Sequence, residues 1–389
     1  MSKTVANSDS WALVYSRRFD DFTFGEDHPF KVARYRLTYE LLRMLGLLDL
    51  PGVRQVECPF APEELLTGFH APGYLATLKE FSRDSTPRAN FRYGLGDVEN
   101  PVFQGVYEWS LLGCGGTLEA ARQVVDEGCR VAFSLAGGYH HAHAARASGF
   151  SYLNDAVIAI QELVRRGLRV AYVDIDAHHG DGVQEAFYTC SRVLTISLHE
   201  SGENFFPQTG FPLELGEGEG YGYSVNLPFR AHSDDLIFEQ GFRSVVLPML
   251  QAFAPDVLVT QMGVDTLRTD PLTRLEMTTG TIEYAAREFL ATGLPWVCIG
   301  GGGYEKLNVA RSWALLWAAI VGAEVPDHLP EDFVALIRDL GYDDTRLRDV
   351  PHLAQPNDFA RAQESLEKNL RILERKLFPL HGLSGGGHR

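Results

Sequence analysis

The sequence has few cysteines, no long apolar run and no excess of basic residues. Its five cysteines are scattered and form no C-x-x-C pair, which argues against a disulfide framework or a structural thiolate zinc site and favours a reducing compartment. The longest apolar stretch, from Trp313 to Val325, is far shorter than the roughly 20 residues that span a bilayer. The first residues lack the apolar core of a secretory signal. We therefore expect a cytoplasmic protein without a membrane partner.

Acidic residues dominate the charge of the chain. Aspartate and glutamate number 51 against 35 lysines and arginines, which gives a formal net charge of −16. Because no basic stripe is present to displace counterions from phosphates, we expect no nucleic-acid partner, whereas a cationic substrate is compatible. The 389 residues are 45% hydrophobic, so a sizeable core is available and a disordered or fibrous chain is excluded. The oligomeric state is left open, a homo-oligomer included.

No repeat, low-complexity block or Pro/Ser-rich linker divides the chain. We predict one domain over residues 11–380 and a flexible C-terminal tail over 381–389. The middle of the chain alternates short, β-branched apolar runs with helical patterns, which is typical of a parallel sheet covered on both faces. The predicted strands lie within 129–138, 168–176, 192–199, 256–265 and 295–303. The fold class is therefore α/β, a single domain with a central, mostly parallel sheet flanked by helices.

Two helical patterns lie between these strands. One covers 156–167, with Asn154 or Asp155 as its cap, the other covers 282–293, and each ends at a glycine. Nearly every predicted strand runs into a cluster of His, Asp, Gly or Tyr. In open α/β sheets the site lies at the carboxyl ends of the strands, so we expect these clusters, spread from residue 140 to 304, to converge.

The strongest chemical signal lies in the segment 173–182. In an extended strand alternate side chains share a face, so Asp174, Asp176 and His178 are predicted to project the same way. Buried polar groups are costly unless an ion or a hydrogen-bond network satisfies them, and a mere run of turn residues does not need three on one face. With Asp265 from another strand end, Asp176 and His178 make three metal ligands and an open fourth position, the pattern of a catalytic site. Zn²⁺ is the expected metal, but this O, N, O set is less thiophilic than most zinc sites, so Fe²⁺, Mn²⁺ and Co²⁺ are alternatives.

A pair of adjacent histidines, His140 and His141, follows another predicted strand in a glycine-rich loop. Two imidazoles in this setting are suited to proton transfer near neutral pH. The chain also offers Asp174 and Asp181 as carboxylates that could orient them. The pair is therefore a candidate for general acid–base chemistry.

Four glycines, residues 300–303, precede Tyr304 at the end of the last predicted strand. They permit close backbone approach to a ligand, with the phenol placed to donate a hydrogen bond to a developing oxyanion. A nucleotide loop is the alternative, but neither phosphate-binding pattern fits the segment. The chain has no G-x-S-x-G or H-E-x-x-H motif, which excludes serine-hydrolase and zincin readings. His143 and His179 lie close to these motifs, and we expect no necessary role for either.

Together these motifs resemble the histone deacetylase family, in the zinc-dependent branch that includes bacterial acetoin-utilization proteins and acetylpolyamine amidohydrolases. The resemblance runs from His28 to Tyr304 through several motifs in the family's order, among them GGYHHAHAARASGFSYLND, DIDAHHGDGVQEAFY and QMGVDTLRTDPL. It implies a single arginase-deacetylase-type domain that removes acetyl groups from N-acetyl-lysine side chains of proteins or peptides and releases acetate. The alternatives are a deacetylase of small acetylamines such as acetylpolyamines, an arginase-like bimetallic ureohydrolase, and a non-catalytic acyl-lysine-binding protein.

The resemblance also implies roles for individual positions. The expected catalytic residues are His140, His141, Tyr304, Asp174 and Asp181. The expected zinc ligands are Asp176, His178 and Asp265. A structural potassium ion is expected beside the zinc, held by Asp174, Asp176, His178, Ser197 and Leu198. The substrate-binding positions are Glu99, Gly149, Phe150, Phe206, Leu272 and Gly302. Arg34 matches the arginine of an internal channel through which acetate leaves.

Two positions depart from the family pattern. The rim acid is usually an aspartate before Cys-Pro or Thr-Pro, whereas this chain has Asp97-Val98-Glu99-Asn100-Pro101, so Glu99 is the expected equivalent and Asp97 the alternative. Leu272 occupies the place where one relative has a glutamate that selects polyamines, which favours acetyl-lysine over acetylpolyamine. The chain after about residue 325 carries no family signature.

Overall fold

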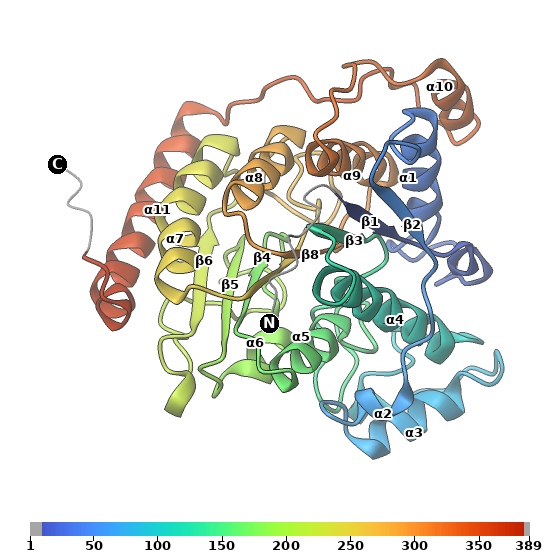
Figure 1. Cartoon of the computed structure of the whole chain (residues 1–389), viewed down its shortest axis with the longest axis horizontal. Coiled ribbons are helices and arrows are strands. Elements are labelled where there is room, and N and C mark those ends of the chain that lie inside the picture. The colour runs from blue at the N-terminus through green and yellow to red at the C-terminus, as the bar shows by residue number, and fades with distance from the viewer. Residues whose placement is uncertain (1–9, 385–389) are drawn as a thin grey trace, which may run out of the picture.

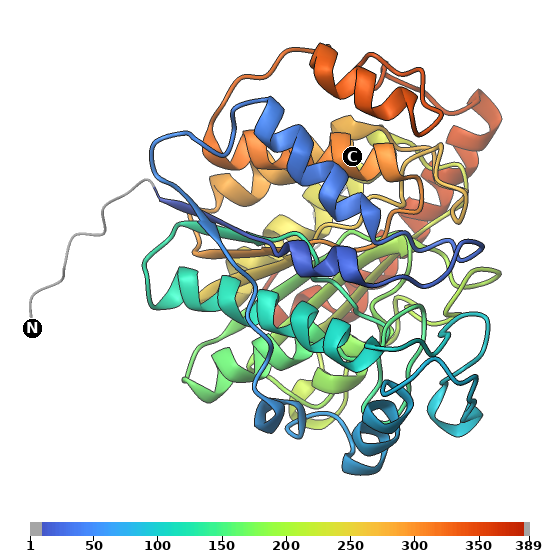
Figure 2. The same cartoon turned by 90° about the vertical axis from the view of Figure 1, so that its right-hand side faces the viewer.

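The computed structural model describes residues 10–384, which form one parallel sheet between two layers of helices (Figures 1 and 2). Its strands are β1 (Trp11–Val14), β2 (Val53–Val56), β3 (Val131–Ser134), β4 (Val170–Asp174), β5 (Val193–Glu200), β6 (Ser224–Phe229), β7 (Val257–Gln261) and β8 (Trp296–Ile299). The order across the sheet is β2-β1-β3-β8-β7-β4-β5-β6, and every pair of neighbours is parallel. The predicted α/β class is confirmed.

The five predicted strands are the five contiguous strands β3, β8, β7, β4 and β5 at the centre of the sheet. Their residues are buried on both faces, and such strands appear in a sequence as continuous apolar runs. The sequence did not reveal β1, β2 or β6, which complete the two sides of the sheet. β2 is a partly exposed edge strand with two polar residues, and β6 contains a proline, so neither has the apolar pattern of a central strand.

Helices cover both faces of the sheet, as the edge-on view in Figure 2 shows. One layer contains α1 (Ala33–Met44), α7 (Asp235–Phe253), α8 (Thr279–Ala291) and α9 (Lys306–Val321). The other contains α4 (Val106–Val125), α5 (Asp155–Arg165) and α6 (Asp181–Phe187). α11 (Pro356–Lys376) packs against α7 and β6 at one side of the sheet (Figure 1). The remaining elements are α2 (Glu63–Leu66), α3 (Pro72–Phe81), α10 (Glu331–Arg338) and the 3₁₀ turns Arg17–Asp21, Phe91–Tyr93, Gly218–Gly220 and Phe378–His381.

Both predicted helices are present. The cap of α5 is Asn154, whose side chain accepts the N–H of Val157, whereas the carboxylate of Asp155 turns back to accept the N–H groups of Gly138 and Tyr139. The helix therefore holds the loop that carries the two histidines. α8 begins three residues earlier than predicted because Thr278 caps it.

The predicted face shared by Asp174, Asp176 and His178 is wrong in its geometry. β4 ends at Asp174, because the Asp174 carboxylate accepts the N–H of Asp176, and the Asp176 carboxylate accepts the N–H of His178. These two side-chain bonds, each reaching two residues ahead, replace the strand with consecutive turns. As a result, Asp174 bonds to His140, whereas Asp176 and His178 form a group with Asp265, and Asp176 also lies 3.9 Å from Nε2 of His140.

The apolar stretch that begins at Trp313 lies largely in the buried helix α9. Within residues 10–384, no helix combines the length and the apolar character that crossing a membrane requires. The predicted tail, 381–389, lies partly outside the described residues. Its first residues belong to the fold, because His381 bonds to the carbonyl of Gly222 and Leu383 donates its N–H to Phe378.

Candidate active site

Four strand ends deliver the predicted residues to one place. His140 and His141 follow β3, Asp176 and His178 follow β4, Asp265 follows β7, and Tyr304 follows β8. A small cavity lies among them, and its lining includes the predicted residues Arg34, His140, His141, Gly149, Phe150, Asp176, Gly302 and Tyr304. The clusters spread from residue 140 to 304 therefore converge as expected for the carboxyl edge of a parallel sheet.

Asp176, His178 and Asp265 form a buried triad whose ligand atoms all lie within 4.8 Å of one another. The Nδ1 of His178 lies 2.9 Å from Asp265 Oδ2 and 3.1 Å from Asp176 Oδ1. Gln261 and the backbone of Gly302 donate hydrogen bonds of 2.6 and 2.7 Å to the other oxygen of Asp176. Such outer contacts hold ligand side chains in place before a metal binds.

The triad has the charge that a divalent cation would balance. Its two carboxylates are almost fully buried, and no lysine or arginine within residues 10–384 forms an ion pair with either of them. Burial opposes protonation of His178, but Asp176 and Asp265 outweigh burial and raise its pKa to about 10. Burial and Asp176 raise the pKa of Asp265 to about 6. A buried O, N, O set with surplus negative charge suits Zn²⁺ or a related divalent ion.

The two adjacent histidines each donate Nδ1–H to a carboxylate. His140 bonds to Asp174 and His141 bonds to Asp181, both at 2.7 Å. Burial disfavours the charged form of His140, yet Asp174 and Asp176 raise its pKa to about 9. Burial and the neighbouring His140 lower the pKa of His141 to about 4. At neutral pH the pair thus offers one charged imidazole and one neutral imidazole whose Nε2 can accept a proton.

Tyr304 lines the cavity, and a residue that sequence reasoning missed holds its backbone. The buried carboxylate of Asp270 accepts the N–H of Tyr304 at 2.7 Å and the N–H of Leu272 at 2.9 Å. The Tyr304 ring packs edge-on against Phe150, and burial raises the pKa of its hydroxyl. The phenol therefore stays protonated and can donate a hydrogen bond. The only sequence signal for Asp270 was its place before a proline at a turn.

Two sets of hydrogen bonds distinguish the surroundings of the two candidates for the rim acid. The carboxylate of Asp97 accepts the N–H groups of Glu99 and Asn100, so its role is to close a turn. The carboxylate of Glu99 accepts the N–H of Gly149 at 2.5 Å, next to Phe150 of the cavity wall. Of the two expected candidates, Glu99 is therefore the one beside the cavity.

Aromatic rings surround the imidazoles. Phe206 lies edge-on to His141 with ring centroids 5.0 Å apart, and it is partly exposed, as a residue at a mouth would be. Phe205, which sequence reasoning missed, stacks on His178 at 4.6 Å. Leu272 is not among the residues that line the cavity. Its backbone N–H bonds to Asp270, which also accepts the N–H of Tyr304.

Arg34 is buried and is one of the residues that line the cavity. It donates hydrogen bonds to the carbonyl of Gly303 and the hydroxyl of Tyr35, and its guanidinium lies 4.2 Å from the centroid of the Phe30 ring. Arg34 forms no ion pair with a carboxylate in the described chain. A buried cation that lacks an acidic partner can receive a small anion.

The remaining predicted positions, Ser197 and Leu198, lie on β5. Ser197 stands opposite Asp174 in the register of β4 and β5, and Leu198 follows it. The hydroxyl of Ser197 bonds to His199. The placement of Asp174 and Ser197 side by side is compatible with the expected potassium site.

The two histidines for which we expected no role both have polar partners. His179 bonds to Thr209 and Gln184, which ties a loop to α6. His143 lies between Glu185 and Asp181, the carboxylate that bonds to His141. The sequence did not predict this contact because α6 brings the two acids to His143 only in the folded chain.

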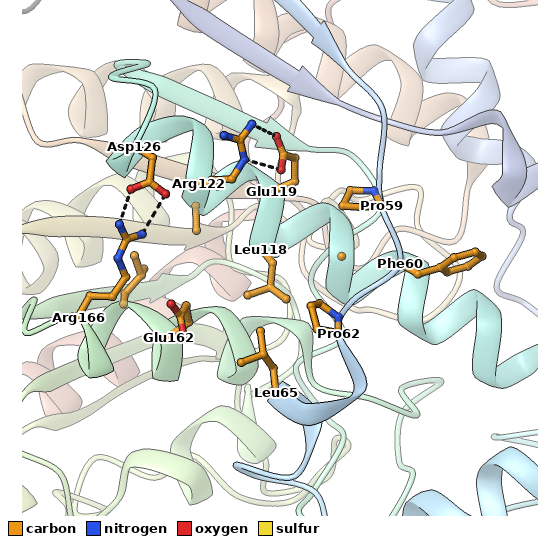
Figure 3. Close-up of a pocket in the computed structure, with 13 residues that line it drawn as sticks. Pro59, Phe60, Pro62, Leu65, Leu118, Glu119, Arg122, Asp126, Glu162 and Arg166 are labelled. Atoms are coloured by element: carbon orange, nitrogen blue, oxygen red, sulfur yellow. Dashed lines mark hydrogen bonds and ion pairs between the residues drawn. The ribbon is translucent and has the colours of Figure 1, made fainter.

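A second concave region, a groove of about 340 Å³, lies between α4, α5 and the segment 59–65 (Figure 3). Apolar side chains such as Leu65 and Leu118 face it, and its charged groups include two ion pairs, Arg122 with Glu119 and Arg166 with Asp126. No histidine or cysteine is among the described residues that line it. The carboxylates of the groove are each paired with an arginine, and the group of converging metal-ligating side chains lies elsewhere, so the smaller cavity is the candidate active site.

Comparisons with known proteins agree with this geometry. A model of the histone deacetylase domain matches residues 28–320. The chain is 38% identical to the acetoin utilization protein AcuC of Bacillus subtilis, an alignment that covers 83% of this chain and 85% of that protein. It is 36% identical to histone deacetylase 9 of Arabidopsis thaliana, with 84% and 77% covered, and to human histone deacetylase 1, with 85% and 68% covered.

The fold also matches solved structures. The crystal structure of a histone deacetylase homolog from Aquifex aeolicus superposes with a TM-score of 0.84 at 31% identity and covers 93% of this chain and 100% of that one. A structure of a histone deacetylase homolog complexed with SAHA matches with the same TM-score at 30% identity and the same coverage. The expected single domain of the arginase-deacetylase type is thereby confirmed.

Proposed function

The chain belongs to the histone deacetylase family, and from this premise we propose that it hydrolyses the acetyl amide of N-acetyl-lysine side chains in proteins or peptides, releasing acetate and a free amine. The observation that carries the proposal is the convergence of the Asp176, His178 and Asp265 triad with His141 and Tyr304 at one cavity. These groups match the needs of amide hydrolysis, which are an electrophile for the carbonyl, a base for water and a donor for the oxyanion.

We propose Zn²⁺ as the metal held by the triad, with Fe²⁺, Mn²⁺ or Co²⁺ as substitutes of the same coordination. Such an ion supplies a Lewis acid and lowers the pKa of water that it binds. The same proposal includes a structural potassium ion, which would be held by Asp174, Ser197 and the backbone carbonyls of Asp176, His178 and Leu198.

In this proposal His141 takes the proton from the attacking water and returns it to the leaving amine. Its low pKa supports the first step, because a neutral imidazole is available at neutral pH. His140 stays protonated and acts by its charge. Tyr304 donates its hydroxyl hydrogen to the oxyanion, and Phe150 and Phe206 bound the path of the acyl-lysine stem.

The first prediction concerns Glu99, which we propose binds the backbone N–H of a peptide substrate. Glu99→Gln keeps an oxygen for Gly149 but loses the charge. A hydrogen bond to a charged group is worth about 1.5 to 3 kcal/mol, so kcat/KM for acetyl-lysine peptides should fall by about ten-fold or more. Free acetyl-lysine lacks the peptide backbone, so the variant should hydrolyse it with the same kcat/KM as the wild type. An equal loss for both substrates would show that Glu99 serves the fold or the chemistry instead.

The second prediction separates the proposal from an arginase-like bimetallic enzyme. Within residues 10–384 one group of three ligating side chains converges, and a second metal would need further bridging carboxylates. Elemental analysis of the purified enzyme should therefore find about one transition metal per chain, as expected for a site of three protein ligands. Two metals per chain together with ureohydrolase activity would overturn the proposal.

The substrate class is tested by comparing kcat/KM for acetyl-lysine peptides, acetylpolyamines and longer acyl-lysines, since specificity is a ratio of these values. We expect acetyl-lysine peptides to rank first. A higher value for acetylpolyamines would favour the small-acetylamine alternative, and no hydrolysis of any member by metal-loaded enzyme would favour a non-catalytic binding protein.

A further inference from the structure

His143 is held between two carboxylates of helix α6. Its Nδ1 lies 2.5 Å from Glu185 Oε2, and its Nε2 lies 3.4 Å from Asp181 Oδ2. Asp181 and Glu185 are four residues apart and so share a face of the helix. A backbone bridge between His143 and Arg146 keeps the histidine loop in place.

This geometry favours the charged form of His143. A neutral imidazole has one N–H and one lone pair, so one of its nitrogens would present a lone pair to a carboxylate. An imidazolium donates from both nitrogens. The hydrogen bonds with Asp181 and Glu185 raise the pKa of His143 to about 10, which agrees with the geometry. Asp181 and Glu185 are the ionisable groups in contact with His143, and His141 lies on the far side of Asp181.

Asp181 divides its two oxygens between two imidazoles. Oδ1 accepts Nδ1–H of His141 at 2.7 Å and the N–H of Gly182 at 2.9 Å, while Oδ2 faces His143. The neighbouring carboxylate of Asp174 differs, because its partners besides His140 are the hydroxyl of Tyr172 and the N–H of Asp176. A cationic side chain behind the carboxylate thus distinguishes the His141 pair from the His140 pair.

We propose that His143 is a positioning residue for His141, and that its imidazolium anchors Oδ2 of Asp181 so that Oδ1 stays directed at Nδ1 of His141. With Nδ1 occupied by hydrogen, Nε2 is the nitrogen of His141 free to accept a proton. Glu185 is the outer anchor, since it bonds to the opposite nitrogen of His143. The catalytic consequence rests on the proposed function, in which His141 moves the proton.

The kinetic test compares three variants in metal-loaded enzyme. Replacing the outer partner of a metal-ligating side chain typically lowers activity about 10- to 100-fold, and we expect a cost at the low end of that range for the outer partner of Asp181. His143→Ala should therefore lower kcat by about ten-fold and leave KM within about two-fold. His143→Lys restores a cation with several donors and should recover most of that loss. His352→Ala is the matched control, because His352 also bonds to a glutamate and has 28% side-chain exposure against 25% for His143. It should behave as the wild type.

A double-mutant cycle separates positioning from a purely structural role. If His143 acts through the charge of Asp181, His143→Ala should cost less than about two-fold in kcat when Asp181 is already asparagine. An unchanged ten-fold cost in the Asp181→Asn background would overturn the proposal. If His143→Ala fails to fold, as judged by thermal unfolding, His143→Gln takes its place, because glutamine keeps a donor and removes the charge.

An activity-independent test uses NMR of the imidazole nitrogens, with and without zinc. In the wild type, both nitrogens of His143 should carry hydrogen and His141 should be the Nδ1–H tautomer. In His143→Ala, His141 should become a mixture of tautomers. If the tautomer shift occurs but the enzyme deacetylates no substrate, the proposed function fails and the positioning role stands. If the enzyme is an active deacetylase and His141 has the same tautomer in the wild type and in His143→Ala, the inference is wrong.

Discussion

Replacing Tyr304 by phenylalanine is expected to lower kcat by about 10²- to 10³-fold, the usual cost of losing one oxyanion donor. Burial keeps the Tyr304 hydroxyl protonated, so it is available as a donor across the neutral range. Phenylalanine preserves the ring that packs against Phe150 and His178, so the walls of the cavity should persist. Steady-state kinetics on an acetyl-lysine peptide should show the lower kcat. Elemental analysis of the same variant should show an unchanged metal content.

The control for this substitution is Tyr221→Phe, because Tyr221 is half exposed and not among the cavity-lining residues. It should leave both kcat and metal content unchanged. Full activity in Tyr304→Phe would refute the assigned role. A loss of metal in that variant would instead assign Tyr304 to the support of the triad.

Replacing Gly302 by alanine is expected to remove metal binding and activity together. A Cβ at this position would lie 2.2 Å from Asp265 Oδ2 and 2.7 Å from Asp176 Oδ2. Both carboxylates are buried and held by other hydrogen bonds, such as that from Ala177 N–H to Asp265, so they cannot move aside without losing partners. Metal content by elemental analysis should fall to background, and hydrolysis of an acetyl-lysine peptide should fall with it.

Gly280→Ala is the matched control, since the nearest atom to its Cβ would be the side-chain hydroxyl oxygen of Thr278 at 3.1 Å. Gly280 lies in the first turn of α8, away from the triad, where alanine is well tolerated. The control should bind metal as the wild type does. A Gly302→Ala enzyme with a full complement of metal would mean that the triad in solution is wider than this structure shows.

The central part of the fold could be predicted because its signals are local. β3, β4, β5, β7 and β8 are buried on both faces and therefore appear as apolar runs, and the rule that sites form at their carboxyl ends places the polar clusters together. The strands β2 and β6 escaped prediction because polar residues or a proline interrupt their apolar residues. β2, for example, has two adjacent exposed polar residues between two partly buried valines, so its four positions show neither a continuous apolar run nor an alternation.

Within the site, residue type and order pointed to Asp176, His178, Asp265, the two adjacent histidines and Tyr304. Contacts between distant segments decided the rest. The choice between Asp97 and Glu99 depended on which carboxylate closes a turn, and the importance of Asp270 depended on its reach to the backbone of Tyr304. Strand periodicity placed Asp174 with the triad, whereas hydrogen bonds that end β4 directed it to His140.

The sequence by itself determined the class of fold, the family and the candidate residues of the site, because apolar periodicity and the order of motifs are properties of the chain. Only the tertiary structure decided how charge is distributed around the histidines. His143 is separated from Glu185 by 42 positions, and it comes to lie between two acids only when α6 packs beside its loop. Burial and distance set the pKa of a side chain, and neither exists until the chain has folded.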